Sequence, residues 1–254
     1  MYGLADVEKL RTIGQLIELG QKASVLCEKA RSGAHLDPPG LLLLPNQLEK
    51  IENIYNFLIS FDLEKAENAI ANLQLGLSTR LALEQVYLPL LVRLGTEWAN
   101  AKINIAQEHF ASNFLRLRLA PLLITSDIRI GIPKKVVCAT LENELHEGGL
   151  LLLSAQLKIR NWSVYYMGAS LPAHALLIAC DAIKPDAVCL SFVNEAGLFS
   201  NLEQLSKVSN DIFIGGSAIN RIDEEQAMKI PSNVHPLKLS AQDAAEILTE
   251  MYRD

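Results

Sequence analysis

The sequence lacks three features that would place it in common functional classes. It has no C-x-x-C motif, because its four cysteines are far apart, so paired-cysteine metal and redox sites are not expected. Its apolar runs, such as Leu41–Leu44 and Leu150–Leu153, are far shorter than the roughly 20 residues that span a bilayer. Its formal net charge is −6, which argues against strong nucleic-acid binding by this chain alone.

The remaining composition is typical of a folded globular protein. With 254 residues, of which 50% are hydrophobic and 20% charged, the chain can bury a sizeable core in one or two domains. Met1 is not followed by a basic and then apolar leader, so we expect a cytoplasmic protein without membrane contact. Three cysteines, Cys138, Cys180 and Cys189, lie in apolar segments, where buried structural thiols are common.

Residues 1–33 are predicted to form a small helical piece of their own. Apolar residues recur at helical spacing from Val7 to Leu19, and Gly20 is the expected stop. The segment that follows, residues 32–39, collects Ser, Gly, Asp and two prolines. Such a composition indicates a linker, which would separate this piece from the rest of the chain.

Residues 41–127 have the pattern of a four-helix bundle. Apolar residues at helical spacing predict helices at residues 46–60, 62–75, 78–98 and from 104 onward. Asp62 is the expected N-cap of the second helix, because its side chain can accept a hydrogen bond from the first turn. Pro89 is expected to kink the third helix and Pro121 to end the fourth, since proline has no backbone N–H to donate.

Residues 133–254 change to short β-rich segments that alternate with helices, which is the pattern of βαβ units. The predicted strands are residues 135–141, 163–166, 187–191, 212–214 and 234–237. Five strands in this order indicate a flavodoxin-like, Rossmann-type parallel sheet, whose ligands bind at the carboxyl ends of the strands. The chain is therefore expected to combine an α bundle with an α/β domain.

One histidine lies on the loop that leaves the first predicted strand. The loop contains Glu144 and His146, and an apolar helix is expected to start at Gly148. A metal-binding histidine usually donates its other ring N–H to a carboxylate, which fixes the tautomer and raises the basicity of the ligating nitrogen. Glu144 and His146 could form such a pair.

Three motifs are expected to converge on this edge of the sheet. They are Glu144-x-His146-x-x-Gly149 after the first strand, Ser191-Phe192-Val193 at the end of the third, and Gly215-Gly216 after the fourth. Their order and spacing resemble the cobalamin-binding domain family, over about residues 135–253. A solvated loop histidine and an ordinary glycine turn would explain the same residues.

The resemblance assigns a role to each of these residues. It implies that His146 is the lower axial ligand of cobalt, in place of the cofactor's own base, and that Glu144 supports it. Gly149, Ser191, Gly215 and Gly216 would line the slot for the displaced nucleotide tail, and Val193 would also contact the cofactor.

The bundle carries a second resemblance. Trp98 is followed by Glu108-His109, a W-x9-E-H pattern that resembles the cap of adenosylcobalamin-dependent light sensors of the CarH/LitR photoreceptor family. In that family these side chains pack over the upper face of the corrin. A buried tryptophan beside a salt-bridged Glu-His pair is the alternative. Ala99 departs from the family, which has a histidine there to bind cobalt after photolysis, so the light response and the upper ligand stay open.

The N-terminal helix carries a third resemblance. The pattern from Tyr2 through Asp6-Val7 to Leu19-Gly20 resembles the last helices of a MerR-type DNA-binding domain. The resemblance implies a remnant at residues 1–33 without the helix-turn-helix that reads DNA. The acidic charge balance agrees, because phosphate contacts supply most non-specific DNA affinity.

Together these features favour a regulator over an enzyme. We expect a cobalamin-binding transcriptional regulator, with adenosylcobalamin favoured and methylcobalamin possible as the cofactor, that changes its oligomeric state when the upper ligand is lost. A homodimer or homotetramer is expected, with Arg116 and Arg118 in ion pairs or an oligomer interface. The alternatives are a corrinoid methyl carrier and an antirepressor that binds a transcription factor rather than DNA.

Overall fold

The computed structural model describes residues 24, 45–75, 77–124, 132–208 and 210–253. The chain divides into two compact units, residues 1–48 and 49–254. The predicted helical piece at residues 1–33 lies outside the described residues, apart from Ser24. Among the helices that are described, none is long and apolar enough to cross a membrane.

Helices make up the first part of the described chain, and they match the predicted bundle closely. They are α3 (Pro45–Ile59), α4 (Leu63–Gln74), α5 (Thr79–Ala82), the π-helical η1 (Leu83–Tyr87), α6 (Leu88–Ala99), α7 (Ile105–Leu119) and α8 (Pro121–Ile124). Asp62 caps α4 as predicted, because its side chain accepts a hydrogen bond from the backbone N–H of Lys65. Asn104 and Gln107 form a capping box that starts α7.

The third predicted helix is continued through a π turn rather than simply kinked at its proline. Pro89 cannot donate a backbone hydrogen bond, so an α-helical ladder is interrupted one turn before it. The chain adopts the wider π geometry over Leu83–Tyr87, in which the N–H of Leu88 bonds to the carbonyl of Leu83. The helix then resumes as α6.

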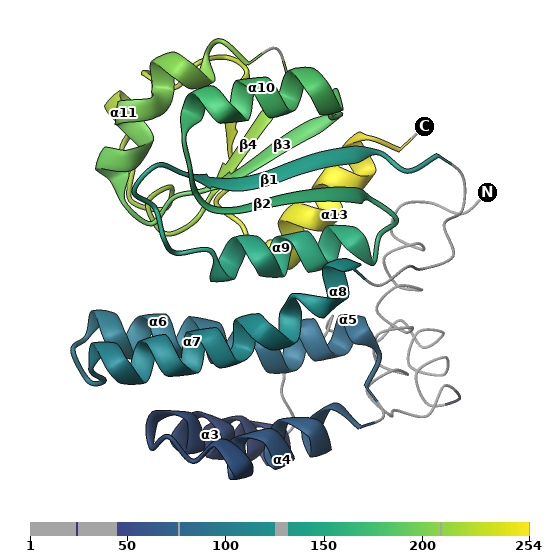
Figure 1. Ribbon diagram of the computed structural model, residues 1–254, viewed down its shortest axis with the longest axis vertical. Helices are drawn as coiled ribbons and strands as arrows, with labels where there is room; N and C mark the ends of the chain where they lie inside the picture. The colour runs from purple at the N-terminus through teal and green to yellow at the C-terminus, as the bar shows by residue number, and fades with distance from the viewer. Residues whose placement is uncertain (1–23, 25–44, 76, 125–131, 209, 254) are drawn as a thin grey trace. The chain divides into compact units, whose positions relative to one another are not determined.

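The second part is a five-stranded parallel sheet with helices on both faces (Figure 1). Its strands are β1 (Lys135–Leu141), β2 (Ser163–Leu171), β3 (Ala187–Ser191), β4 (Ile212–Gly215) and β5 (Val234–Pro236). The helices between and after them are α9 (Gly148–Lys158), α10 (Ala173–Ile183), α11 (Glu195–Leu205), α12 (Glu224–Ala227) and α13 (Ala241–Met251). The strand order β2-β1-β3-β4-β5 confirms the predicted flavodoxin-like fold.

Alternating strand residues form two separate hydrophobic cores. Val137 of β1 and Val188 of β3 pack with α10 and α11, whereas their neighbours Val136 and Ala187 pack with α9 and α13. Parallel strands covered on both faces read as continuous apolar runs, which is why these strands could be recognised in the sequence.

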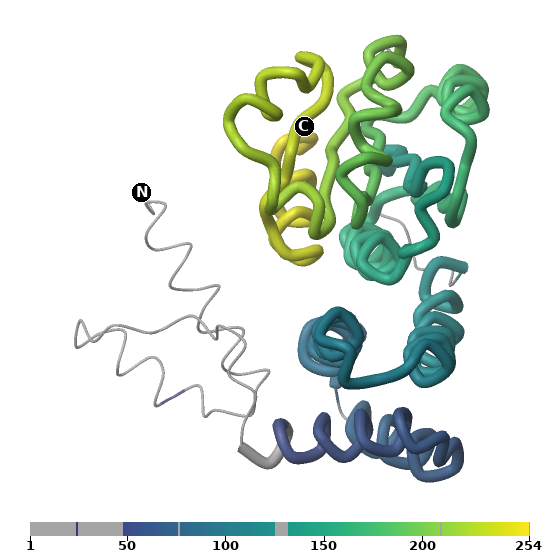
Figure 2. The backbone as a smooth tube through the Cα atoms, turned by 90° about the vertical axis from the view of Figure 1, so that its left-hand side faces the viewer, coloured from purple at the N-terminus to yellow at the C-terminus, as the bar shows by residue number. Residues whose placement is uncertain are grey.

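The topology places the candidate motifs together. From β1 the chain runs to β2 on one side and later returns to β3 on the other, so β1 and β3 flank the topological switch point. Their carboxyl ends, and that of β4, meet at one edge of the sheet. Figures 1 and 2 show α6 and α7 as the layer of the bundle next to α9, with α3 and α4 below them, farther from the sheet.

Candidate functional site

Glu144 and His146 form the pair that their spacing suggests. The loop from β1 to α9 brings His146 Nδ1 to 2.6 Å from Glu144 Oε1, and the backbone N–H of His146 donates to the same oxygen at 3.0 Å. One carboxylate oxygen therefore fixes both the backbone and the ring of the histidine.

The second oxygen of Glu144 ties this loop to the loop after β3. The backbone N–H groups of Val193 and Asn194 donate to Glu144 Oε2 at 2.8 and 3.1 Å. Burial raises the pKa of the Glu144 carboxyl, but the hydrogen bonds from Val193 and His146 outweigh it, so the pKa lies below its usual value. An ionised Glu144 accepts from Nδ1–H, which leaves the lone pair of His146 on Nε2.

The His146 ring is half-exposed at the carboxyl edge of the sheet. Its side chain keeps 54% of its accessible surface, against 4% for Glu144. Within the described part of the chain Nε2 has no hydrogen-bond partner. The arrangement can thus supply one oriented, basic nitrogen to a group that lies outside the loop.

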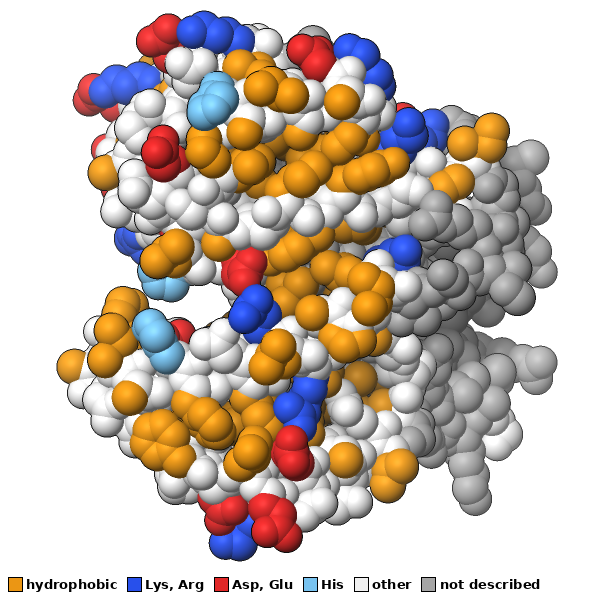
Figure 3. Space-filling view, viewed as in Figure 1, with side chains coloured by type: hydrophobic (Ala, Val, Ile, Leu, Met, Phe, Trp, Pro, Cys, Tyr) orange, Lys and Arg blue, Asp and Glu red, His pale blue; other side chains and the backbone are white. Residues whose placement is uncertain are grey.

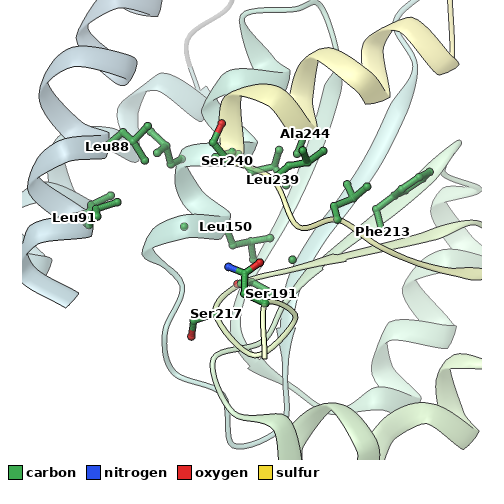
Figure 4. A pocket seen from close by; sticks show the side chains of 18 of the residues that line it. Leu88, Leu91, Leu150, Ser191, Phe213, Ser217, Leu239, Ser240 and Ala244 are labelled. Atoms are coloured by element: carbon green, nitrogen blue, oxygen red, sulfur yellow. The ribbon is translucent and has the colours of Figure 1, made fainter. Parts of the chain in front are cut away.

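A cavity of about 470 Å³ lies at the same edge of the sheet, between α9, α13, the ends of β3 and β4, and α6. Gly149, Ser191, Gly215 and Gly216, which the sequence predicts to share a slot, all line it. Figure 4 shows Leu88 and Leu91 of α6 on one side of the cavity and Phe213 of β4 on the other. The cavity is mostly apolar and is large enough to bury a small heterocyclic group.

Two glycines at the cavity serve different purposes. A Cβ atom at Gly149 would meet no atom within 4 Å, so the absent side chain leaves open space in the cavity. Gly216 has φ +100°, and a Cβ atom there would lie 2.4 Å from the backbone oxygen of Phe192. Gly216 is therefore required by the backbone itself, which packs tightly against the end of β3.

Ser191 supplies a polar side chain to the cavity. It is 8% exposed, and its hydroxyl has no hydrogen-bond partner among the described residues. A hydroxyl that opens into an apolar cavity is suited to pair with a polar atom of a bound group. A single imidazole nitrogen, an apolar slot and this hydroxyl fit the cobalamin expected from the sequence, since that cofactor brings the other ligands of its metal.

The bundle places Trp98 opposite the histidine. The ring centroids of Trp98 and His146 are 6.1 Å apart with an interplanar angle of 47°, and Trp98 is 43% exposed. Trp98 is therefore not buried in the core of the bundle, and the alternative of a buried tryptophan does not hold. Figure 3 shows a hollow between the bundle and the α/β domain, with histidine side chains on both rims.

Glu108 and His109 form their expected pair but do not line the cavity. His109 Nδ1 lies 2.7 Å from Glu108 Oε2, and the His109 side chain is 66% exposed. Glu108 also accepts a hydrogen bond from Ser112. The cofactor contacts predicted for this pair stay predictions.

The backbone N–H of Val193 holds Glu144, and the Val193 side chain does not line the cavity. Sequence reasoning assigned Val193 a cofactor contact, which stays a prediction. It also missed the bundle residues that line the cavity, Leu88, Leu91 and Val92. Their apolar spacing is that of any packed helix, so no sequence signal separates them from core residues.

A comparison with protein families matches the bundle. Residues 50–122 match the family described as the B12 binding domain. The match runs from within α3 to within α8, and it includes α6, which lines one side of the cavity.

Comparison with characterised proteins finds two repressors of Myxococcus xanthus. The HTH-type transcriptional repressor CarA is 28% identical over 193 residues, which are 76% of this chain and 63% of CarA. The HTH-type transcriptional repressor CarH is 28% identical over 222 residues, which are 85% of this chain and 70% of CarH. The chain thus spans somewhat less than two thirds of the length of CarA.

Among solved structures, the monomethylamine corrinoid protein of Methanosarcina barkeri has the same fold. It superposes with a TM-score of 0.63 at 12% sequence identity, and the match covers 81% of this chain and 99% of that protein. At this identity the similarity concerns the arrangement of the bundle and the parallel sheet.

Proposed function

We propose that this chain is a cobalamin-binding regulatory protein of the cytoplasm, similar to transcriptional repressors and not itself an enzyme. Adenosylcobalamin is the proposed form of the cofactor, and loss of its upper ligand is proposed to change the oligomeric state of the protein. The observation that carries the proposal is the buried Glu144 carboxylate, whose hydrogen bonds orient His146 at the edge of the sheet where the apolar cavity lies.

Different residues of this site would bind different parts of the cofactor. His146 Nε2 would ligate cobalt from below, and the cavity lined by Gly149, Ser191 and Gly215 would hold the nucleotide tail. Trp98, which faces His146 from the bundle, would cover the side of the cofactor away from His146. When bound, adenosylcobalamin supplies a cobalt–carbon bond that light can break.

A regulator needs a ligand that favours one arrangement of the protein over another. The adenosyl group would provide this difference if it were held where α6 and α7 approach α9 of the α/β domain. Since Ala99 follows Trp98, the chain has no histidine there to bind the vacated position. The proposed light response is therefore more readily reversible than a response in which a second histidine binds cobalt after photolysis.

The second candidate is a corrinoid protein that carries methyl groups for a methyltransferase. It is favoured by the fold shared with the Methanosarcina barkeri protein. A third, an antirepressor that binds a transcription factor, is favoured by the net charge of −6. The similarity to CarA and CarH ranks both below the regulator.

Light separates the regulator from the methyl carrier. The protein is purified in darkness with adenosylcobalamin, and its absorption spectrum and mass by light scattering are recorded before and after green light. We expect a spectral change together with a change in mass, because the lost group supports one arrangement only. A matched sample with methylcobalamin controls for the upper ligand.

Two results would reject the light-responsive regulator. One is a spectral change on illumination with no change in mass in either sample. The other is rapid transfer of the methyl group from the methylcobalamin sample to a thiol acceptor in the presence of a methyltransferase.

A further inference from the structure

A charged cluster joins the bundle to the loop that carries His146. Arg116 of α7 places Nη1 3.4 Å from Oε1 of Glu147, the residue that directly follows His146. Tyr166 of β2 donates its hydroxyl to the other oxygen of Glu147 at 2.7 Å. A single carboxylate thus links the bundle, the His146 loop and the sheet.

The partners of Glu147 keep it in this position. The Glu147 side chain is 16% exposed and that of Arg116 is 44% exposed. Burial, and then the bond to Glu147, raises the pKa of the Tyr166 hydroxyl, so Tyr166 remains a hydrogen-bond donor at neutral pH. Tyr166 of the sheet therefore holds the Glu147 carboxylate in place, and Arg116 of the bundle forms an ion pair with it.

A second and more buried cluster joins the same two parts elsewhere. Glu246 of α13 accepts from Arg80 of α5 at 3.0 Å and from Arg160 at 3.1 Å. Arg80 also bonds to Glu84 of η1 at 2.8 Å. These side chains are 12–33% exposed, so salt screens them less than the pair formed by Arg116.

We propose that Arg116, Glu147 and Tyr166 form a clasp that sets how closely α6 and α7 approach His146, and so controls access to its Nε2. The more buried cluster at Glu246 keeps the two parts joined when the clasp opens. The proposal rests on the proposed function only for the identity of the group that enters.

The gap between Trp98 and His146 has to widen for a flat group to lie between their two rings. Carbon atoms in contact are about 3.5–4.0 Å apart, so a flat group between two rings needs a separation of about 7 Å. The rings of Trp98 and His146 are 6.1 Å apart and inclined to each other. An ion pair that is partly exposed is weak enough to open and close readily.

Fluorescence quenching of Trp98 measures the opening without any cofactor. The other tryptophan, Trp162, is 3% exposed and gives a constant background. Arg116→Gln is expected to raise the acrylamide quenching constant by about 1.3- to 2-fold, because loss of an exposed ion pair shifts the opening only modestly. Tyr166→Phe is expected to act in the same direction, and Trp98→Phe to remove the response.

Salt distinguishes a clasp from general loosening of the bundle. In 1 M salt, where the Debye length is about 3 Å, the wild-type protein is expected to approach the quenching of Arg116→Gln. That variant itself should respond little to salt. Arg118→Gln is the matched control, since Arg118 lies on the same helix but pairs with Glu67 inside the bundle.

A second measurement follows entry of the cofactor. Adenosylcobalamin is expected to bind Arg116→Gln about two- to fivefold faster than the wild type, as the loss of one such pair implies. Equal quenching and equal salt response in the Arg116 and Arg118 variants would overturn the clasp. If the wild-type protein takes up no cobalamin, the proposed function is rejected. The quenching experiment, which uses no cofactor, would still test the clasp.

Discussion

Replacing Gly149 by phenylalanine is expected to abolish tight binding of cobalamin while the fold stays intact. A Cβ atom at this position would meet no atom within 4 Å beyond its own helical turn, so a phenylalanine ring has room to enter the cavity. Excluding an apolar ring from the cavity removes the burial of about one large side chain, which corresponds to a loss of affinity on the order of 100-fold. The affinity is measured by titration of the absorption spectrum.

Gly197→Phe is the matched control. Gly197 also lies in the first turn of a helix, α11, with open space beside it, and it does not line the cavity. The urea concentration at the midpoint of unfolding should be as high in both variants as in the wild type, or higher, because glycine is a poor helix former. Cobinamide, which lacks the nucleotide tail, should bind to Gly149→Phe and wild type alike. Unimpaired binding of cobalamin to Gly149→Phe would show that the cavity does not hold the tail.

Replacing Glu144 by glutamine is expected to lower the free energy of unfolding by about 2–4 kcal/mol, measured by urea denaturation without cofactor. The buried carboxylate accepts hydrogen bonds from Val193, Asn194, the backbone of His146 and its ring. A glutamine side chain has one acceptor oxygen, so its amide group would face N–H donors. The same variant should also lose the fixed orientation of His146.

The pH dependence provides a check on this stability effect. The pKa of Glu144 in the folded protein lies below its usual value of 4.5, so its contribution is complete above that pH and is lost as the pH falls through the folded pKa. The difference between wild type and Glu144→Gln should therefore shrink below about pH 4.5. Glu142→Gln, an exposed change in the same loop, should have no comparable effect. Equal stability of the two variants would contradict the role of Glu144.

The strands illustrate which parts of the fold the sequence encodes locally. β1 is buried from Val136 to Leu141 and is mostly apolar, and its bounds Lys135–Leu141 agree with the prediction. β2 extends to Leu171, five residues beyond its predicted end. Gly168 and Ser170 both have positive φ, and the pairing of β1 and β2 is irregular there. In a sequence, glycine and serine here suggest a turn. The strand continues past them only because it pairs with β1.

The candidate site shows the same limit. The pairing of Glu144 with His146 follows from a separation of two residues on one loop. The amides of Val193 and Asn194 that hold Glu144 leave no trace in the sequence, because every residue other than proline has a backbone N–H. The contact of Arg116 with Glu147 likewise depends on how α7 packs against the α/β domain.

The most direct test of the central claim identifies the nitrogen below cobalt. Histidine labelled with ¹⁵N is incorporated, cobalamin is bound and reduced to its cobalt(II) form, and the electron paramagnetic resonance spectrum is recorded. Ligation by His146 predicts doublet nitrogen splittings, because ¹⁵N has spin one half, and their loss in His146→Ala. Triplet splittings from the cofactor's own ¹⁴N base, alike in wild type and His146→Ala, would contradict the assignment.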